Sequence, residues 1–160
     1  MGLNEMKIVR SSAIVLATSV ALMAACGVAT GAEPSQAERN KQLVLTAYQG
    51  LFGDHDLTVI NKYWAEDYIQ HNPYMSDGRD SIKTYVRKLG IENWPRTQVK
   101  VLRVAADGDL VFLQTVQPKM AQSPEMVIVD IFRVANGKIA EHWDTMQAVP
   151  ANASNPRPMY

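Results

Sequence analysis

The most chemically distinctive part of the sequence is a pair of apolar runs at 128–134 and 139–144. Asp130 stands in the middle of the first run between β-branched residues, where a carboxylate is expensive to bury without a partner. His142 and Asp144 lie in the second run. Two carboxylates beside an imidazole can share and transfer a proton, so this segment is the candidate site of acid–base chemistry.

Whether the three side chains share a face depends on the turn at Asn136-Gly137, which is a strong hairpin signal. A two-residue turn sets Asp130 opposite Trp143, whereas a three-residue loop over 135–137 sets it opposite His142. Only the longer loop gathers the ionisable groups on one face, and we therefore expect it. The other face would then carry a set suited to a subunit interface or solvent rim, namely Val129, Ile131, Arg133, Glu141 and Trp143.

His71 is the second candidate, because it lies where a helical segment is expected to end and where it can project toward the mouth of a pocket. Its alternative role is structural, since polar groups near chain breaks often bond to the backbone. His55 lies in a polar turn and is expected to be solvated. No HExxH or HxH spacing favours a metal, and neither GxSxG nor a glycine-rich phosphate loop is present. We expect no metal and no cofactor.

The N-terminal segment 1–32 has the pattern of a secretory signal peptide. Lys7 and Arg10 precede an apolar stretch that ends in small residues at 30–32. A membrane anchor is the alternative, but the strongly apolar part is shorter than the roughly 20 residues that a bilayer requires. The run Met23-Ala24-Ala25-Cys26 also resembles a lipobox, which would lipidate Cys26 and tie the protein to a membrane. We expect cleavage after Ala32 and export to the periplasm or medium.

The mature chain would consist of one domain at 33–150 and an irregular tail at 151–160. The whole chain carries 16 basic and 16 acidic residues, and removal of 1–32 leaves a net charge of −1. This balance gives no reason to expect nucleic acid as a partner. Cys26 is the only cysteine, so an intrachain disulfide and a CxxC site are excluded.

The hydrophobic period changes along the mature chain from 3.6 to 2. A helix is predicted at 37–52, a short second helix after Asp54 or Asp56, and a third at 80–89. After Trp94-Pro95, strands are predicted from 99 to the Asp107-Gly108 turn and at 110–117, 126–134 and 138–147. Helices followed by a meander predict an α+β fold, in which a curved antiparallel sheet and about three N-terminal helices form a cone-shaped pocket.

Two segments resemble the SnoaL-like polyketide cyclase group of the nuclear-transport-factor-2-like superfamily: 68–73 followed by Gly78, and 130–144. The resemblance covers roughly 39–150 and implies a curved antiparallel sheet with three helices, often dimeric. In those cyclases an aspartate at the position of Asp144 is the acid/base of an intramolecular aldol ring closure. Their histidine on the preceding strand is replaced here by Asp130. A bacterial subgroup of expected aldol-condensation enzymes is more similar, because it shares His71-Asn72-Pro73 and Trp143-Asp144.

The leading hypothesis is a cofactor-independent cyclase or isomerase that moves protons α to a carbonyl of a small hydrophobic substrate. Asp144 would be the general acid/base, Asp130 would share its proton or hold His142, and His71 would join this catalytic set. The residues expected to contact substrate are Tyr48, Gln70, Asn72, Trp64 and Phe132. The alternatives are a non-catalytic small-molecule-binding domain of the cell envelope and a structural dimer module. A homodimer is expected, and whether the protein is an enzyme is left open.

Overall fold

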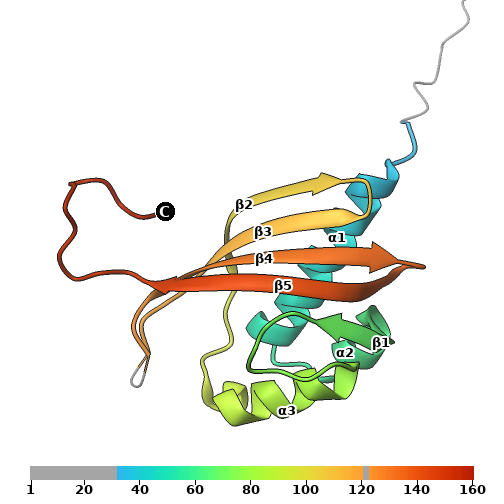
Figure 1. Cartoon of the computed structure of the whole chain (residues 1–160), viewed down its shortest axis with the longest axis horizontal. Helices are drawn as coiled ribbons and strands as arrows, with labels where there is room; N and C mark the ends of the chain where they lie inside the picture. Colours follow the sequence, from blue (N-terminus) through green and yellow to red (C-terminus); the bar gives the residue numbers. More distant parts are fainter. Residues whose placement is uncertain (1–31, 121–122) are drawn as a thin grey trace, which may run out of the picture. The chain divides into compact units, whose positions relative to one another are not determined.

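Three helices and a five-stranded sheet make up the computed structural model, which describes residues 32–120 and 123–160 (Figure 1). The signal peptide expected at 1–32 therefore lies almost entirely outside the described residues. The helices are α1 (Gln36–Tyr48), α2 (Thr58–Tyr63) and α3 (Arg79–Leu89). The strands are β1 (Trp64–Gln70), β2 (Lys100–Asp107), β3 (Leu110–Gln117), β4 (Met126–Ala135) and β5 (Lys138–Ala148). The α+β prediction is confirmed.

The helices begin and end where the sequence provides capping groups. The hydroxyl of Ser35 accepts a hydrogen bond from the backbone N–H of Glu38 at 3.2 Å and so caps α1. The chain continues from α1 into one π-helical turn, Gln49–Gly53. At the end of α3, Gly90 adopts φ +66°, a left-handed conformation that glycine adopts without steric cost.

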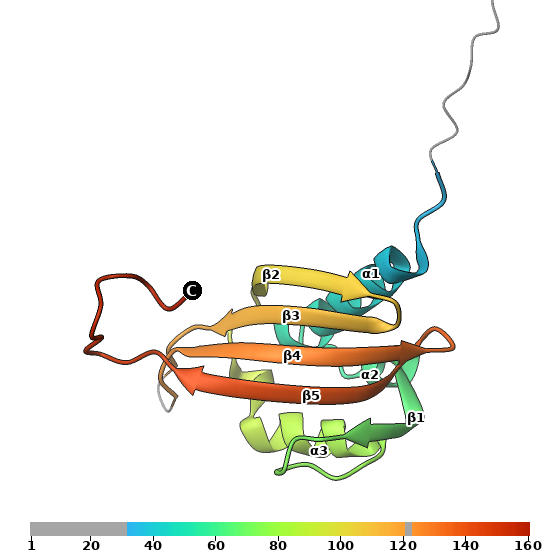
Figure 2. The same cartoon turned by 45° about the horizontal axis from the view of Figure 1, so that its top comes forward.

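One strand, β1, was not expected from the sequence, which suggested a helical end before His71. It pairs in parallel with β5 through Ile69 with Glu141 and Gln70 with His142. The strand order is β1-β5-β4-β3-β2, and the sheet is therefore mixed, which corrects the expectation of a purely antiparallel sheet. In Figure 2 the sheet lies in front and the helices lie behind it, so the helices cover one face only.

The hairpin between β4 and β5 differs from the expected three-residue loop. Ala135 pairs with Lys138, so the turn has two residues, and Asn136 and Gly137 take φ +51° and +70°, as a type I′ turn requires. The pairing then shifts by one residue between Arg133 and Val134, which places Ala140 in a β-bulge.

This bulge restores the shared face that the longer loop was expected to provide. It sets Asp130 directly opposite Asp144, and it sets Phe132 opposite His142. Because side chains alternate along a strand, the one extra residue reverses the face of everything beyond it on β5. The expected loop is wrong, yet all three ionisable groups share the face that the helices cover.

Replacing Gly137 with alanine is expected to lower the free energy of unfolding by about 1–2 kcal/mol, because a Cβ disfavours the left-handed conformation. Beyond the two adjoining residues, no described atom lies within 4 Å of the added Cβ, so the cost is conformational and not steric. Chemical denaturation measures this change. Asn136→Gly is the control, since glycine at the neighbouring left-handed position should not destabilise the turn. Equal stability of Gly137→Ala and the original protein would contradict the turn assignment.

The hydrophobic core lies between the helices and the covered face of the sheet. Its fully buried side chains include Val44, Leu51, Ile60, Val86, Leu113 and Ile139. Among the described residues, no helix is both long and apolar enough to cross a lipid bilayer.

Candidate active site

A cavity of about 1210 Å³ lies between the covered face of the sheet and the helices. Its apolar walls combine aliphatic, methionine and aromatic side chains, with Trp64, Tyr68 and Phe132 among the aromatic ones. Its polar wall groups include Asp130, His142 and Asp144 from the two central strands. A large apolar chamber with a few convergent polar groups is typical of a small-molecule site.

Asp130 and His142 form a buried pair in the cavity wall. The Nε2 atom of His142 lies 2.9 Å from Oδ1 of Asp130, and the two residues are only 7% and 4% exposed. The ring of Phe132 stacks on the imidazole with 4.7 Å between centroids, which fixes the plane of the imidazole. The pair is therefore rigid as well as shielded from water.

Gln70 determines where the protons of this pair lie. Its Oε1 atom accepts a hydrogen bond from the backbone N–H of Asn72 at 2.9 Å, and its Nε2 atom donates to the hydroxyl of Tyr68 at 3.0 Å. Oε1 also lies 3.0 Å from Nδ1 of His142, so Nδ1 carries a proton and donates it. The contact between His142 and Asp130 must then hold one further proton, bound either to Nε2 or to the carboxyl group.

The environment of Asp130 favours its protonated form. Burial raises the pKa of this carboxyl group, and the charge of Asp144 adds to the rise, whereas the hydrogen bond and charge of His142 and hydrogen bonding by the Tyr48 hydroxyl oppose it. Its second oxygen, Oδ2, is buried and has no hydrogen-bond partner among the described residues. A buried, unpaired carboxylate oxygen is costly, whereas a protonated Oδ2 can donate to a ligand in the cavity.

Asp144 occupies a different environment, although it lies directly opposite Asp130. The side-chain amide of Asn72 donates to both of its carboxylate oxygens, at 3.0 Å and 2.8 Å. Asn72 is buried, and its own Oδ1 accepts from the backbone N–H of Tyr74 at 2.9 Å, which fixes the amide orientation. These bonds hold the Asp144 carboxylate in place at the cavity wall.

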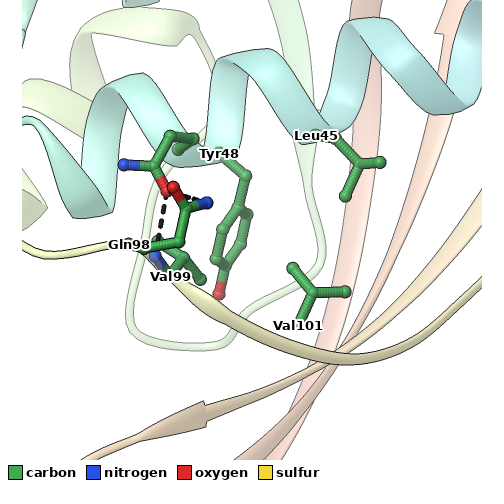
Figure 3. A pocket seen from close by; sticks show the side chains of 6 residues that line it. Leu45, Tyr48, Gln98, Val99 and Val101 are labelled. Carbon is green, nitrogen blue, oxygen red and sulfur yellow. Dashed lines mark hydrogen bonds between the residues drawn. The ribbon is translucent and has the colours of Figure 1, made fainter.

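Tyr48 contributes a phenol to the same chamber. Its hydroxyl lies 3.3 Å from the hydroxyl of Thr115, and burial, followed by the charge of Asp130, raises its pKa well above the usual value. Tyr48 is therefore a neutral hydrogen-bond donor. Figure 3 shows its ring descending from α1 beside Val99, where it also borders a smaller pocket of about 320 Å³ lined by Leu45 and Val101.

His71 does not join this group, and the expectation that it faces the pocket mouth is wrong. Its imidazole stacks on Trp143 with 4.6 Å between centroids and an interplanar angle of 7°. Its Nε2 atom lies 2.9 Å from Oε1 of Glu141, whose other oxygen accepts from Arg133 at 2.6 Å. Because β1 is a strand, Gln70 points into the cavity and the next residue points to the outer face.

The remaining expected contact residues are placed in two ways. Trp64, Phe132 and Gln70 line the cavity, although Gln70 uses its side chain to orient His142. Asn72 does not line it and bonds Asp144 instead. The sequence did not point to Tyr85. Burial raises the pKa of this tyrosine, and the charges of Asp144 and Asp130 add to the rise.

The donor set fits proton transfer better than cation binding. Asp130, His142 and Asp144 offer ligand atoms within 4.8 Å of one another. Both ring nitrogens of His142, however, already contact oxygen atoms, and Asn72 donates to both oxygens of Asp144. Binding a metal ion at His142 would first break one of its two contacts, because an imidazole nitrogen has at most one lone pair, whereas the carboxylate oxygens of Asp130 and Asp144 keep lone pairs free.

A sequence profile described as the SnoaL-like domain matches residues 44–142, which include Asp130 and His142. The chain belongs to the SnoaL-like family. Its match extends over more than half of the chain and includes all or part of every strand of the sheet. No curated protein matches the sequence.

Solved structures with the same fold carry several different activities in their names. A protein assigned as a SnoaL-like polyketide cyclase from Jannaschia sp. CCS1 is 22% identical, with a TM-score of 0.58 over 72% of this chain and 91% of that chain. An LEH-like epoxide hydrolase from M. tuberculosis is 18% identical, with a TM-score of 0.57 over 71% and 86%. A protein assigned as a ketosteroid isomerase from Kribbella flavida DSM 17836 is 21% identical, with a TM-score of 0.55 over 76% and 84%. At these identities the SnoaL-like protein shares their fold alone.

Proposed function

We propose that this SnoaL-like protein is a cofactor-independent enzyme that moves protons α to a carbonyl of a small hydrophobic substrate. Aldol condensation, cyclisation and isomerisation all require this step. The observation that carries the proposal is the pair of facing carboxylates in one apolar cavity, Asp130 and Asp144, held in different environments. Opposed environments assign one carboxyl group as acid and the other as base.

In the proposed reaction, Asp144 is the general base. Its carboxylate removes the α-proton as the C–H bond breaks, and Asn72 keeps it oriented toward the cavity. Asp130 is the general acid, which donates the proton on Oδ2 to the carbonyl oxygen and so yields a neutral enol. His142 holds Asp130 through Oδ1, and its second proton bonds to Gln70.

Tyr48 is a further donor in this scheme, because a neutral phenol in the cavity wall can hydrogen-bond the developing negative charge on the carbonyl oxygen. Asp144 keeps the acid–base role of the sequence-based hypothesis, and Tyr48, which was expected among the substrate contacts, is here a hydrogen-bond donor. Asp130 is now the acid in place of a helper of Asp144, Gln70 is a positioning residue, and His71 has no role in the chemistry.

Hydrogen–deuterium exchange tests the proposal with simple ketones in place of the natural substrate. Hydrophobic ketones such as α-tetralone and acetophenone are incubated with the protein in D2O, and loss of the α-proton signals is followed by NMR. We expect exchange above the buffer rate for at least one ketone that binds. Binding of several ketones with no exchange of any of them would contradict the proposal.

The non-catalytic binding domain stays the alternative, and the volume and apolar lining of the cavity support it equally. Native mass spectrometry of the protein from its own source separates the two. A retained hydrophobic molecule, unchanged on incubation and accompanied by no ketone exchange, favours binding over catalysis.

We also propose export of the mature domain, on the pattern of residues 1–32. Mass spectrometry of protein from the periplasm and the medium should show an N-terminus at Glu33. An N-terminal lipidated Cys26 would instead support the membrane-anchored alternative. Recovery only of the full-length chain from the cytoplasm would contradict both.

The expected homodimer stays a prediction, and the outer face of the sheet is the surface that we propose for it. Three of its apolar side chains are 38–41% exposed there, namely Ile69, Phe112 and Val129. A second copy that packs this face would cover all three. Light scattering should show a dimer that Val129→Lys converts to monomer, whereas Lys62→Gln on α2 should not. A monomeric original protein would contradict the prediction.

A further inference from the structure

We propose that the open end of the cavity binds the carboxylate of an amphipathic ligand whose apolar chain occupies the chamber. Three lysines line this end of the cavity: Lys88, Lys100 and Lys119. The inference deepens the proposed function, because it makes the substrate class an oxo acid with its carbonyl at Asp130 and Asp144. Recognition of the carboxylate does not itself depend on the chemistry at those two residues.

The three lysines come from separate elements that meet at one end of the sheet. Lys88 lies in the last turn of α3, Lys100 is the first residue of β2, and Lys119 follows the end of β3. Figure 1 shows the end of α3, the start of β2 and the end of β3 at the same side of the domain. Among the described residues, none of the three forms an ion pair with a carboxylate.

Glu125, an acidic residue that lines this end of the cavity, is bound by the C-terminal tail. Figures 1 and 2 show the tail after β5 turning back toward the start of β2. The hydroxyl of Tyr160 donates to Oε1 of Glu125, and the ammonium group of Lys100 lies 4.7 Å from the centroid of the Tyr160 ring. Glu125 keeps its negative charge, so the three lysines together with Glu125 leave this end of the cavity with a net charge of +2.

A net positive charge at the mouth of a low-dielectric chamber attracts an anion. Between the lysines and the reacting groups the wall is apolar on β4 and β5, where Met126, Ile128 and Met146 lie. Strand β3 adds the polar side chains of Thr115 and Gln117. A ligand that satisfies both regions has a charged end and a hydrophobic body. Its apolar body lies in the chamber, and its charged end stays near water at the rim.

The strand register sets the spacing between the two ends of this ligand. Lys100 pairs with Val116, and Val116 pairs with Val127, so these residues form one row across the sheet. Asp130 lies three residues further along β4, about 10 Å at the usual rise of an antiparallel strand. This odd offset turns the side chain of Asp130 to the face of the sheet opposite to the side chains of that row, so the ligand should separate its carboxylate from its reactive carbonyl by a chain longer than about 10 Å.

A singly charged carboxylate fits the rim better than a phosphate. The rim presents lysines, which are point charges, and none of the described residues that line the cavity is an arginine that could form the bidentate fork preferred by phosphate. The end of α3 at the rim is its C-terminus, whose partial negative charge disfavours a dianion.

Isothermal titration calorimetry with decanoate and decanamide tests the inference. These probes share one apolar chain and differ in the charge of the head group, and neither has a ketone to react. We expect decanoate to bind about tenfold more tightly at low salt, with the difference shrinking as salt is added. Lys100→Gln and Lys119→Gln should each weaken decanoate binding about two- to fivefold and leave decanamide binding unchanged.

Lys62→Gln is the matched control, because it removes the same charge from α2, outside the cavity. Its affinity for decanoate should equal that of the original protein. Equal affinities for the two probes, or equal losses for both in the Lys100 and Lys119 variants, would overturn the inference. Lysine-dependent decanoate binding without any ketone exchange would instead retain the inference and reject the proposed proton transfer.

Discussion

Replacing Asp144 with asparagine is expected to lower the rate of ketone α-proton exchange by about 100- to 10,000-fold, the usual contribution of a general base. The amide has nearly the same shape as the carboxylate, so the cavity should persist, although only one of the two hydrogen bonds from Asn72 is kept. The amide cannot accept the α-proton, however, because a neutral amide is a far weaker base than a carboxylate. NMR exchange kinetics measure the rate, and circular dichroism checks that the fold is retained.

Glu141→Gln is the matched control for this variant. It makes the same carboxylate-to-amide change on the same strand, but Glu141 lies on the outer face, where it contacts His71 and Arg133. We expect its exchange rate to stay within about twofold, since surface ion pairs contribute little. An Asp144→Asn protein that exchanges as fast as the original would refute Asp144 as the base.

Replacing Asp130 with asparagine is expected to lower the exchange rate by about 100-fold or more while preserving the structure. In the proposed scheme Nε2 of His142 donates to Oδ1 of Asp130, and it can donate equally to the oxygen of the new amide, whose NH2 group then takes the place of Oδ2. The variant therefore imitates the protonated carboxyl group but cannot release a proton. An exchange rate equal to that of the original protein would exclude Asp130 as the acid.

The same variant also predicts a change in how stability depends on pH. The folded state raises the pKa of Asp130, so the unfolded chain releases this proton first as pH rises. The original protein should therefore lose stability between the usual pKa of an aspartate and the raised value, and the Asn variant should not. Between about pH 4 and about pH 8, the melting temperature of Asp130→Asn should rise relative to that of the original protein as pH rises.

Asp80 provides a control of opposite sign. It is exposed on α3, and its hydrogen bond and ion pair with Lys83 lower its pKa. Because its pKa is lowered, the ionised Asp80 stabilises the folded state at pH values above the usual aspartate range, and this stabilisation is lost as pH falls. As pH rises, Asp80→Asn should therefore lose stability relative to the original protein, the opposite of Asp130→Asn, and only slightly. Parallel pH profiles of Asp130→Asn and the original protein would contradict a raised pKa at Asp130.

The sequence by itself determined most of the elements, because helix and strand periods are local properties. The helices and the four antiparallel strands lie close to the predicted ranges, since capping groups, glycines and Asn136-Gly137 mark their ends. It did not predict β1, because that strand is defined by pairing with β5, about 70 residues away. Such a contact leaves only a weak trace in the local pattern.

The sequence also determined the identity of the central groups, since Asp130, His142 and Asp144 stand out in apolar strands. Only the tertiary structure decided how they meet. Their shared face results from a bulge at Ala140 and not from the expected three-residue loop. Both place one extra residue between the paired strands and therefore turn the same side chains to one face. Pairing of β1 with β5 turned Gln70 inward and His71 outward, because side chains alternate along a strand and the choice of face is made by the neighbouring strand.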